Sequence, residues 1–205
     1  MKSQKVKYLV EIMQQFMKYG IRSVTMDDIS KNLGISKKTL YKNFKDKDEI
    51  VSTLMQMDIN LEMEMLCSLV ECSENAIEET YSFSKVLTEK LKAVNPSMIY
   101  DLEKYHPQAW KLFETHKRID VYGCIKSNLE RGIEEGFYQE HINPEIVARI
   151  YSEKIDMLFN QELFPANKFK IEEIYSQMIQ YHLRGIVNDK GREYLKNIKL
   201  DKTIL

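Results

Sequence analysis

Proline is absent from the first 95 residues of the chain, and all four prolines lie at Pro96 or beyond it. Proline breaks the backbone hydrogen bonding of a helix, so its absence permits long uninterrupted helices in the first half of the chain. Apolar residues recur at helical spacing almost from end to end, and no repeat or low-complexity segment interrupts them. These features predict an all-α protein.

Long apolar runs are also lacking, and none approaches the roughly 18 residues that a membrane-spanning helix requires. The N-terminus alternates apolar and charged residues at helical spacing and carries no export signal, so we expect a cytoplasmic protein without a membrane partner. The three cysteines, Cys67, Cys72 and Cys124, have no metal-ligand spacing. We expect them to be buried thiols rather than disulfides, with a redox switch as the alternative.

Motifs of catalysis are missing as well. The sequence contains no glycine-rich phosphate loop, no nucleophile elbow, no zinc motif and no closely spaced acid pair. The four histidines (His106, His116, His141 and His182) are dispersed, so each is better interpreted as a surface or core residue than as a metal ligand. We therefore expect neither an enzyme nor a protein that needs a metal or another cofactor.

What the chain does contain is a two-helix pattern between Thr25 and Lys47. The hydroxyl of Thr25 can cap the first helix, and Gly34 gives the conformational freedom that a sharp reversal needs. Ser36 can cap the second helix, in which Leu40 and Phe44 lie four residues apart and point inward. The pattern therefore predicts two short helices joined by a tight turn, with the second helix pinned through its apolar side.

The outward side of that second helix is cationic and polar, with Lys37, Lys38, Thr39, Tyr41, Lys42 and Asn43. Residues 1–50 contain eleven basic and six acidic side chains (+5), which leaves nineteen basic and twenty-five acidic ones (−6) in the remainder. Attraction to phosphate is thus expected at one end of the chain only. A lysine-rich face that is merely solvated is the alternative, but its place on a helix-turn-helix pattern favours a fit to the DNA major groove.

The same region resembles the N-terminal signature of the tetracycline-repressor (TetR) family over about the first 55 residues. The matching residues are Gly20, Thr25, Ile29, Leu33, Gly34, Ile35, Ser36, Thr39, Leu40, Tyr41, Phe44 and Lys47. Two residues depart from the pattern: Lys38 stands where glycine is frequent, and Ser30 where alanine is usual. The lysine adds a cation and the serine is nearly as small as alanine, so neither weakens the resemblance.

The resemblance implies DNA contacts by Thr25, Ser36, Lys37, Lys38, Thr39, Tyr41, Lys42, Asn43 and Lys47. Thr25 and Lys47 would each meet a phosphate, and the start of the second helix would reach base edges or flanking phosphates. Tyr41 could instead be a half-buried packing residue. Because Leu40 and Phe44 already occupy the inward positions, we favour a DNA contact for Tyr41.

We expect a helix-turn-helix DNA-binding domain of three helices at residues 1–48 and a larger helical bundle at 49–205, with nine or ten helices in all. Beyond the two-helix pattern, helices are predicted near residues 3–19, 47–70, 74–94, 97–104, 107–135, 143–164, 170–187 and 192–198. The pair Asn143-Pro144 is the clearest helix start, since asparagine caps a helix and proline suits its first position. Asn95-Pro96 and Pro165 are expected to end the helices before them.

The helices predicted at 143–164 and 170–187 carry wide apolar stripes. They comprise Val147, Ile150, Tyr151, Met157 and Leu158 on the first helix, and Ile171, Ile174, Tyr175, Met178, Ile179, Leu183 and Ile186 on the second. Such a pair suits a four-helix bundle with a second subunit, although both stripes could be used inside one monomeric core. Similarity to TetR proteins, whose last two long helices form the dimer interface, favours a homodimer. A dimer also places two DNA-binding helices about 34 Å apart, in successive major grooves.

The remaining helices would enclose a pocket for a small effector. Candidate lining residues are Cys67, Tyr81, Met98, Tyr100, Tyr105, Trp110, Phe113, Tyr122, Ile125 and Met157. Individually these side chains are typical of an ordinary core, but together they indicate an apolar or aromatic effector. The function predicted from the sequence is therefore a ligand-responsive repressor. The alternative is a DNA-binding regulator whose bundle binds a protein partner or only dimerises.

Overall fold

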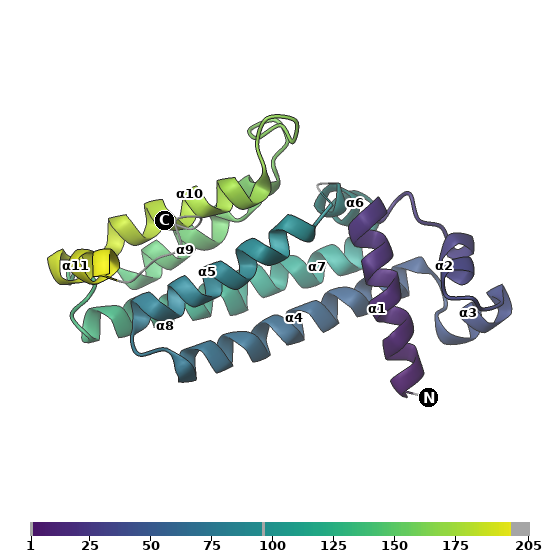
Figure 1. Cartoon of the computed structure of the whole chain (residues 1–205), viewed down its shortest axis with the longest axis horizontal. Helices are drawn as coiled ribbons and strands as arrows, with labels where there is room; N and C mark the ends of the chain where they lie inside the picture. Colours follow the sequence, from purple (N-terminus) through teal and green to yellow (C-terminus); the bar gives the residue numbers. More distant parts are fainter. Residues whose placement is uncertain (1, 96, 198–205) are drawn as a thin grey trace. The chain divides into compact units, whose positions relative to one another are not determined.

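The computed structural model describes residues 2–95 and 97–197, and Figure 1 shows their arrangement. The α-helices are α1 (Lys2–Tyr19), α2 (Met26–Asn32), α3 (Lys37–Asn43), α4 (Lys47–Cys72), α5 (Ala76–Ala93), α6 (Met98–Tyr105), α7 (Pro107–His116), α8 (Tyr122–Glu134), α9 (Pro144–Lys154), α10 (Ile171–Ile186) and α11 (Asp189–Asn197). Extended pairing in the described residues is limited to one isolated antiparallel bridge, Tyr138 with Val187. The predicted fold class, all-α with a three-helix helix-turn-helix head and a larger helical bundle, is confirmed.

The chain divides into two compact units. Unit 1 comprises residues 1–62 and 93–115, and unit 2 comprises residues 63–92 and 116–205. Helix α4 therefore begins in unit 1 and ends in unit 2. A functional boundary after residue 48 stays a prediction.

The core of unit 1 joins α1, α2, α3, α6 and the start of α4. Ile12 of α1, Ile29 of α2 and Leu40 of α3 are fully buried in it, together with Ile50 of α4. Leu102 of α6 belongs to the same cluster. Burying apolar side chains of this size contributes about 1.5–3 kcal/mol each, so the two short helices α2 and α3 are held mainly by this core.

Unit 2 contains the end of α4 together with α5, α8, α9 and α10, which lie side by side in Figure 1, and the short helix α11 that follows α10. Its main cluster includes Ile77 of α5, Leu129 of α8, Ala148 of α9 and Leu183 of α10, all of them buried. Tyr138 is fully buried against Gly132 of α8. A smaller cluster adds Leu91, Leu158 and Tyr175.

The helix predicted over residues 107–135 is continuous as far as Glu134, but it contains a π-helical turn that was not predicted. A π-helical segment, Lys117–Val121, separates α7 from α8. Two buried side chains at the junction are bonded there: His116 to Asp120, and Lys117 through its Nζ to Asp156 Oδ2 at 2.5 Å. The apolar spacing of the sequence does not reveal the extra residue that a π turn contains.

The helix predicted from residue 143 starts as expected but ends early. The side chain of Asn143 accepts the N–H of Ile146, and Pro144 follows as the first helical residue. The helix stops at Lys154, a 3₁₀ turn follows at Asp156–Phe159, and Asn160 Oδ1 then accepts the N–H groups of residues 162 and 163. The chain thus leaves the helix well before Pro165, and the Asn160 side chain bonds the turn that follows.

Three further predictions concern ends and absences. Pro96 and the last residue of the helix predicted at 192–198 lie outside the described residues, whereas α11 covers the rest of that helix. Over the described part of the chain, no helix is long and apolar enough to cross a membrane. In the same part, no group of three or more His, Cys, Asp or Glu side chains could hold a metal ion.

Candidate DNA-binding surface

Helix α2 is fixed at its start by a reciprocal cap. The N–H of Asp28 donates to Thr25 Oγ1 at 3.2 Å, and the N–H of Thr25 donates to Asp28 Oδ2 at 2.9 Å. Hydrogen bonds from the hydroxyl and the N–H of Thr25 lower the pKa of the Asp28 carboxyl. The cap predicted for Thr25 is confirmed, and the threonine remains exposed at the start of the helix.

Helix α3 begins at a second cap. The N–H of Thr39 donates to Ser36 Oγ at 3.1 Å, and the two hydroxyls lie 2.9 Å apart. Gly34, in the turn between α2 and α3, has φ 63°, a left-handed conformation that glycine adopts at low cost. The predicted turn and cap are both confirmed, and they set the direction in which α3 leaves α2.

The two sides of α3 differ sharply. Leu40 is fully buried and Phe44, just after the helix, is 1% exposed. Five predicted contact residues, Lys37, Lys38, Thr39, Tyr41 and Lys42, are exposed, and Asn43 is partly exposed. Tyr41 is 52% exposed, so it is not a core residue. The structure thus presents these side chains together on one helix that is pinned from behind.

Two side chains on the exposed side of α3 are bonded to neighbouring groups. Lys37 Nζ lies 2.6 Å from Asp27 Oδ2, and both side chains are more than half exposed. Such a surface ion pair is worth about 0–1 kcal/mol, so a phosphate could replace the carboxylate at little cost. The side-chain amide of Asn43 donates to the carbonyl of Thr39 at 2.8 Å, which directs it along the helix.

Lys47 occupies a different environment from the other lysines. Its Nζ donates to the carbonyl of Ile21 at 2.5 Å, and burial lowers the pKa of the ammonium group. This lysine therefore joins the start of α4 to the turn after α1. A phosphate contact by Lys47 stays a prediction, and it would have to share the ammonium group with that carbonyl.

Sequence reasoning missed the residues that fasten α6 to this surface. The N–H of Arg22 donates to Asp101 Oδ2 at 2.8 Å, and the Asp101 side chain is buried. His106 Nδ1 lies 2.5 Å from Asp48 Oδ1 in the first turn of α4. The partners are 79 and 58 residues apart in sequence, so no local pattern could have paired them.

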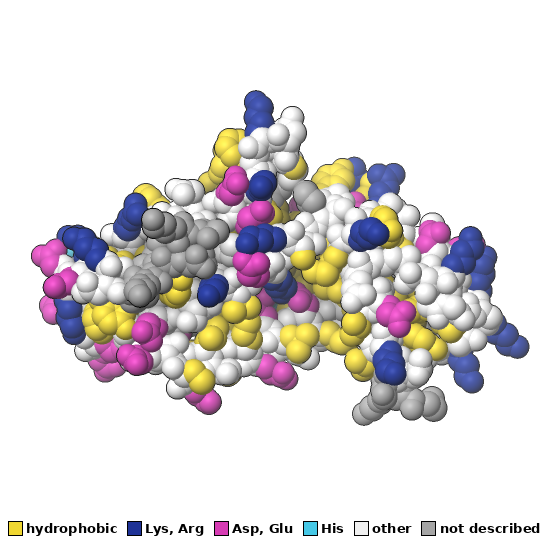
Figure 2. Space-filling model, in the orientation of Figure 1, with side chains coloured by type: hydrophobic (Ala, Val, Ile, Leu, Met, Phe, Trp, Pro, Cys, Tyr) yellow, Lys and Arg dark blue, Asp and Glu magenta, His cyan; other side chains and the backbone are white. Residues whose placement is uncertain are grey.

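Lysine and arginine side chains gather over α2 and α3 in Figure 2. A cationic helix on a buried support is the arrangement with which helix-turn-helix proteins contact a duplex. Comparison with known proteins agrees. Residues 9–54, which span α1 to the start of α4, match the bacterial regulatory proteins of the tetR family. The chain is a transcriptional regulator of the TetR family.

A relative that matches most of the chain is also described as a transcriptional regulator. The uncharacterized HTH-type transcriptional regulator YvaF of Bacillus subtilis (strain 168) is 25% identical over 170 residues, which cover 82% of this chain and 88% of YvaF. A TetR-family regulator from Agrobacterium tumefaciens covers 91% of this chain and 99% of its own at 14% identity, with a TM-score of 0.73. A putative transcriptional regulator from Saccharomonospora viridis, solved in complex with choline, has a TM-score of 0.74 at 16% identity, covering 92% of this chain and 100% of its own. The two structures show that this TetR chain shares their fold.

The residues predicted for a dimer interface fall into two groups in this TetR chain. Tyr151, Leu158, Tyr175, Ile179, Leu183 and Ile186 are buried in the chain's own core. Their side chains are therefore not available to a second subunit. Val147, Ile150, Met157, Ile171, Ile174 and Met178 are partly or largely exposed.

The predicted effector-binding residues are spread over both units. Met98, Trp110 and Phe113 pack against the core of unit 1, and Tyr105 lies under the guanidinium of Arg22. In unit 2, Tyr122 and Ile125 pack against the main cluster, and Tyr81 against the pair Tyr151–Ile179. Tyr100 and Cys67 are exposed. Most of the ten thus serve the packing of their own unit.

Unit 2 contains a groove of about 740 Å³, and of the ten predicted residues Met157 lines it. Its walls come from the end of α5, from α9 with the turn that follows, and from α10. The other apolar walls are Leu158, Phe164, Phe169, Ile174, Met178 and Tyr181. Thr88 and Ser176 add hydroxyl groups, and Lys92, Lys154, Glu172 and Glu173 add charges of both signs.

Proposed function

We propose that this TetR regulator is a repressor that binds a palindromic operator as a homodimer and is released by a small apolar or aromatic effector. The observation that carries the DNA-binding part is the exposed face of α3. Lys37, Lys38 and Tyr41 project from a helix whose opposite side, through Leu40, is fully buried. Lysines can neutralise phosphates or donate to guanine and thymine acceptors, and tyrosine can donate to the backbone.

Dimerisation is supported by apolar side chains that the chain leaves uncovered on α9 and α10. Ile146 and Ile150 are 55% and 50% exposed on α9, and Tyr181 is 73% exposed on α10. Met157, just after α9, is 45% exposed. These two helices lie side by side in Figure 1, so their exposed residues can form one continuous apolar face. A second copy related by a twofold axis would cover that face and complete a four-helix bundle. It would also close the groove of unit 2 on the side lined by Met157 and Tyr181.

An effector site is supported by the groove in unit 2. Its volume of about 740 Å³ lies within the range of small-molecule pockets, about 300–1,000 Å³. Seven of its fifteen lining residues are apolar or aromatic, which suits the class of effector expected from the sequence. The fold has this capacity elsewhere, since the regulator from Saccharomonospora viridis was solved with choline. To release DNA, the effector must bind more tightly to the state in which the two α3 helices no longer match successive grooves.

The DNA-binding proposal is tested by selecting bound fragments from random or genomic DNA, which yields half-site sequence and spacing together. On the selected duplex, the triple variant K37A/K38A/Y41A should lose specific binding while its circular dichroism spectrum and melting temperature stay unchanged. The matched control is K85A, which removes an exposed lysine of α5. Operator binding retained by the triple variant would refute the assignment of α3.

The effector proposal is tested by a thermal-shift screen of apolar and aromatic compounds. A compound that binds the native state raises the melting temperature and should lower the affinity for the selected duplex. Substituting the groove residue Met178 by glutamate should abolish both effects. A compound that raises the melting temperature equally in the M178E variant would bind elsewhere.

A further inference from the structure

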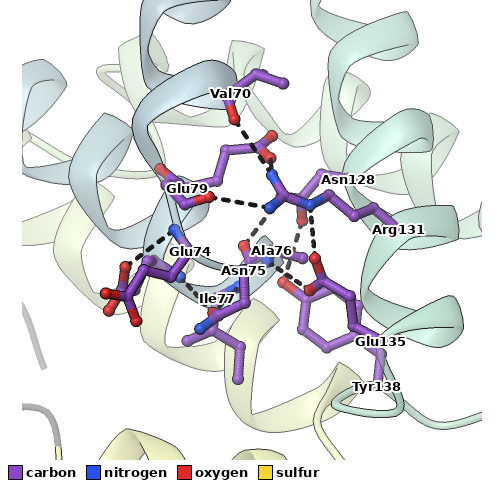
Figure 3. Close-up of polar contacts among 12 residues, drawn as sticks. Val70, Glu74, Asn75, Ala76, Ile77, Glu79, Asn128, Arg131, Glu135 and Tyr138 are labelled. Atoms are coloured by element: carbon purple, nitrogen blue, oxygen red, sulfur yellow. Dashed lines mark hydrogen bonds and ion pairs between the residues drawn. The ribbon is translucent and has the colours of Figure 1, made fainter.

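The guanidinium group of Arg131 in α8 is bonded to residues at the end of α4, in α5 and just after α8 (Figure 3). Its Nη2 donates to the carbonyl of Ser73 at 3.0 Å, and its Nη1 donates to the carbonyl of Val70 at 3.4 Å. Both acceptors lie at the C-terminal end of α4. A cation in this position satisfies carbonyl groups that have no partner inside the helix.

Two carboxylates hold the guanidinium in place. Nη1 of Arg131 lies 3.0 Å from Glu79 Oε2 in α5, and Nε lies 2.7 Å from Glu135 Oε1, just after α8. Glu135 Oε2 also accepts the N–H of Ala76, the first residue of α5, at 2.8 Å. The side chains of Glu79 and Glu135 are 10% and 25% exposed, so these ion pairs are more strongly coupled than surface pairs.

Buried hydrogen bonds also hold the start of α5 against α8. The side-chain amide of Asn128 donates to the carbonyl of Ala76 at 3.0 Å, and its oxygen accepts the hydroxyls of Thr80 and Tyr138. Asn128, Thr80 and Tyr138 are all buried. A buried polar network in which each member is bonded is rigid, because a lost bond would leave a polar group buried without a partner.

Helix α4 has no such cation of its own. Its last turn contains no basic residue, and Glu71 lies in it. The C-terminal end of a helix carries a partial negative charge, so this end depends on a cation from elsewhere. Arg131 is a cation that lies there, and it comes from a helix 59 residues further along the chain than Cys72, the last residue of α4.

The position of this anchor matters because of the length of α4. The helix has 26 residues and is therefore about 39 Å long. Its first residue, Lys47, follows the DNA-binding helix α3 by a short turn and belongs to unit 1, whereas the anchored end belongs to unit 2. A tilt of only about 5° about the anchored end would displace the other end by about 3.4 Å, which is the rise of one base pair.

We propose that Arg131 is a positioning residue that fixes the pivot of α4, and that this anchor sets the operator spacing that the two DNA-binding helices of a dimer can bind. The inference rests on the proposed function, namely a dimer on a palindromic operator. Arg131 does not need to touch DNA or effector. Its effect is on how well both halves of the dimer bind at once, because simultaneous binding of linked sites is lost when their geometry is wrong or variable.

The test compares R131Q with wild-type protein on three duplexes: the selected palindrome, a single half-site, and the palindrome with one base pair added to its spacer. R131Q should lose about tenfold or more in affinity for the palindrome and keep its affinity for the half-site. The penalty that the longer spacer imposes on wild-type protein should shrink in R131Q. The matched control is R192Q, which removes an exposed arginine of α11 that pairs with Asp189. R192Q should behave as wild type on all three duplexes.

Other outcomes overturn the proposal. Unchanged binding of R131Q to the palindrome, or an equal loss on palindrome and half-site by a folded protein, would each refute it. If R131Q does not fold, E79Q serves instead, since it keeps the side-chain length and weakens one partner of the guanidinium; it should show the same pattern with a smaller loss. R131K, which keeps the charge, should recover part of the palindrome affinity.

Failure of the proposed function is distinguishable. Wild-type protein that binds none of the duplexes would refute the DNA-binding role itself. The anchor is then still tested by hydrogen exchange, because loss of the guanidinium should speed exchange of the amides around residues 69–75 in R131Q but not in R192Q. Unchanged exchange there would show that Arg131 does not hold the end of α4.

Discussion

At the scale of single residues, the close packing of Gly132 against Tyr138 can be tested by substituting the glycine. A Cβ atom on Gly132 would lie 2.1 Å from the Tyr138 ring, which is fully buried and would have to shift. We therefore expect G132A to destabilise the protein by about 2 kcal/mol or more, since overpacking of a core costs about 1–3 kcal/mol. Denaturant unfolding monitored by circular dichroism measures the change.

Gly123 supplies the control, because it lies in the same helix and a Cβ atom there would meet nothing within 4 Å. G123A should leave stability unchanged or raise it by up to about 1 kcal/mol, since alanine favours the helix more than glycine does. Equal effects of G132A and G123A would show that the Tyr138 ring does not occupy this position.

His182 should make the stability of the protein decrease as the pH falls. Burial, followed by the positive charge of Lys154, lowers the pKa of its imidazole to about 4, and its ring lies 4.6 Å from that of Tyr151. The unfolded state therefore takes up a proton as the pH falls below about 6.5, whereas the folded state resists protonation until about pH 4. Stability should thus decrease by about 3 kcal/mol across this window. H182Q should lack this part of the decrease in urea unfolding measured at a series of pH values, and an unchanged decrease would assign it to other groups.

Single residues also show what could be predicted from sequence. The caps formed by Thr25, Ser36 and Asn143 were predictable because each bonds a backbone group three residues away. The roles of Lys47 and Arg131 were not, because their partners lie 26 and about 60 residues away. A cation bonded to a distant carbonyl leaves no pattern in the sequence around it.

At the scale of elements, two substitutions at the cap of α3 should affect stability and DNA binding differently. S36A removes the hydroxyl that accepts the N–H of Thr39, so it should cost about 1 kcal/mol of stability. S36D keeps a capping oxygen but adds a negative charge at the start of the helix that we propose to meet phosphates. Stability should therefore be retained in S36D, while affinity for the selected duplex falls strongly. Anisotropy with a labelled duplex and thermal melting measure the two properties, and a S36D protein that binds DNA as wild type would argue against contact at this end of α3.

Elements also mark where apolar spacing stops being informative. Helix α10 is apolar on more than one side: Tyr175, Ile179 and Leu183 are buried, whereas Ile174 is partly exposed and Tyr181 largely exposed. The spacing of apolar residues predicts that several sides of such a helix are buried, but it does not show which of them packs against its own chain. Apolar spacing likewise did not show the π-helical segment or the early end of α9.

At the scale of the whole molecule, the contrast in charge between the ends of the chain was visible in sequence, and it has a measurable consequence. The exposed lysines Lys37, Lys38 and Lys42 all lie on α3. Each phosphate contact that a lysine makes adds about 0.9 to the slope of log affinity against log salt. K38A should therefore bind the selected duplex with a slope smaller by about 1 than wild type, in titrations over a range of salt concentrations. An unchanged slope would remove Lys38 from the phosphate contacts.

We expect the exposed apolar residues of α9 and α10 to determine whether two chains form a dimer. Ile150 is 50% exposed on α9, so glutamate at this position is tolerated by a single chain but would bury a charge in a dimer, at a cost of several kcal/mol. I150E should therefore sediment as a monomer in analytical ultracentrifugation with little change in helical content. L61E is the matched control, because Leu61 is 62% exposed on α4 in unit 1, whereas α9 and α10 belong to unit 2. The I150E monomer should lose affinity for the palindrome while binding a half-site as wild type, because only one α3 helix reaches the duplex at a time. A dimeric I150E protein would show that the twofold contact lies on another surface. Residues of that other surface, and not the exposed apolar residues of α9 and α10, would then set the distance between the two DNA-binding helices.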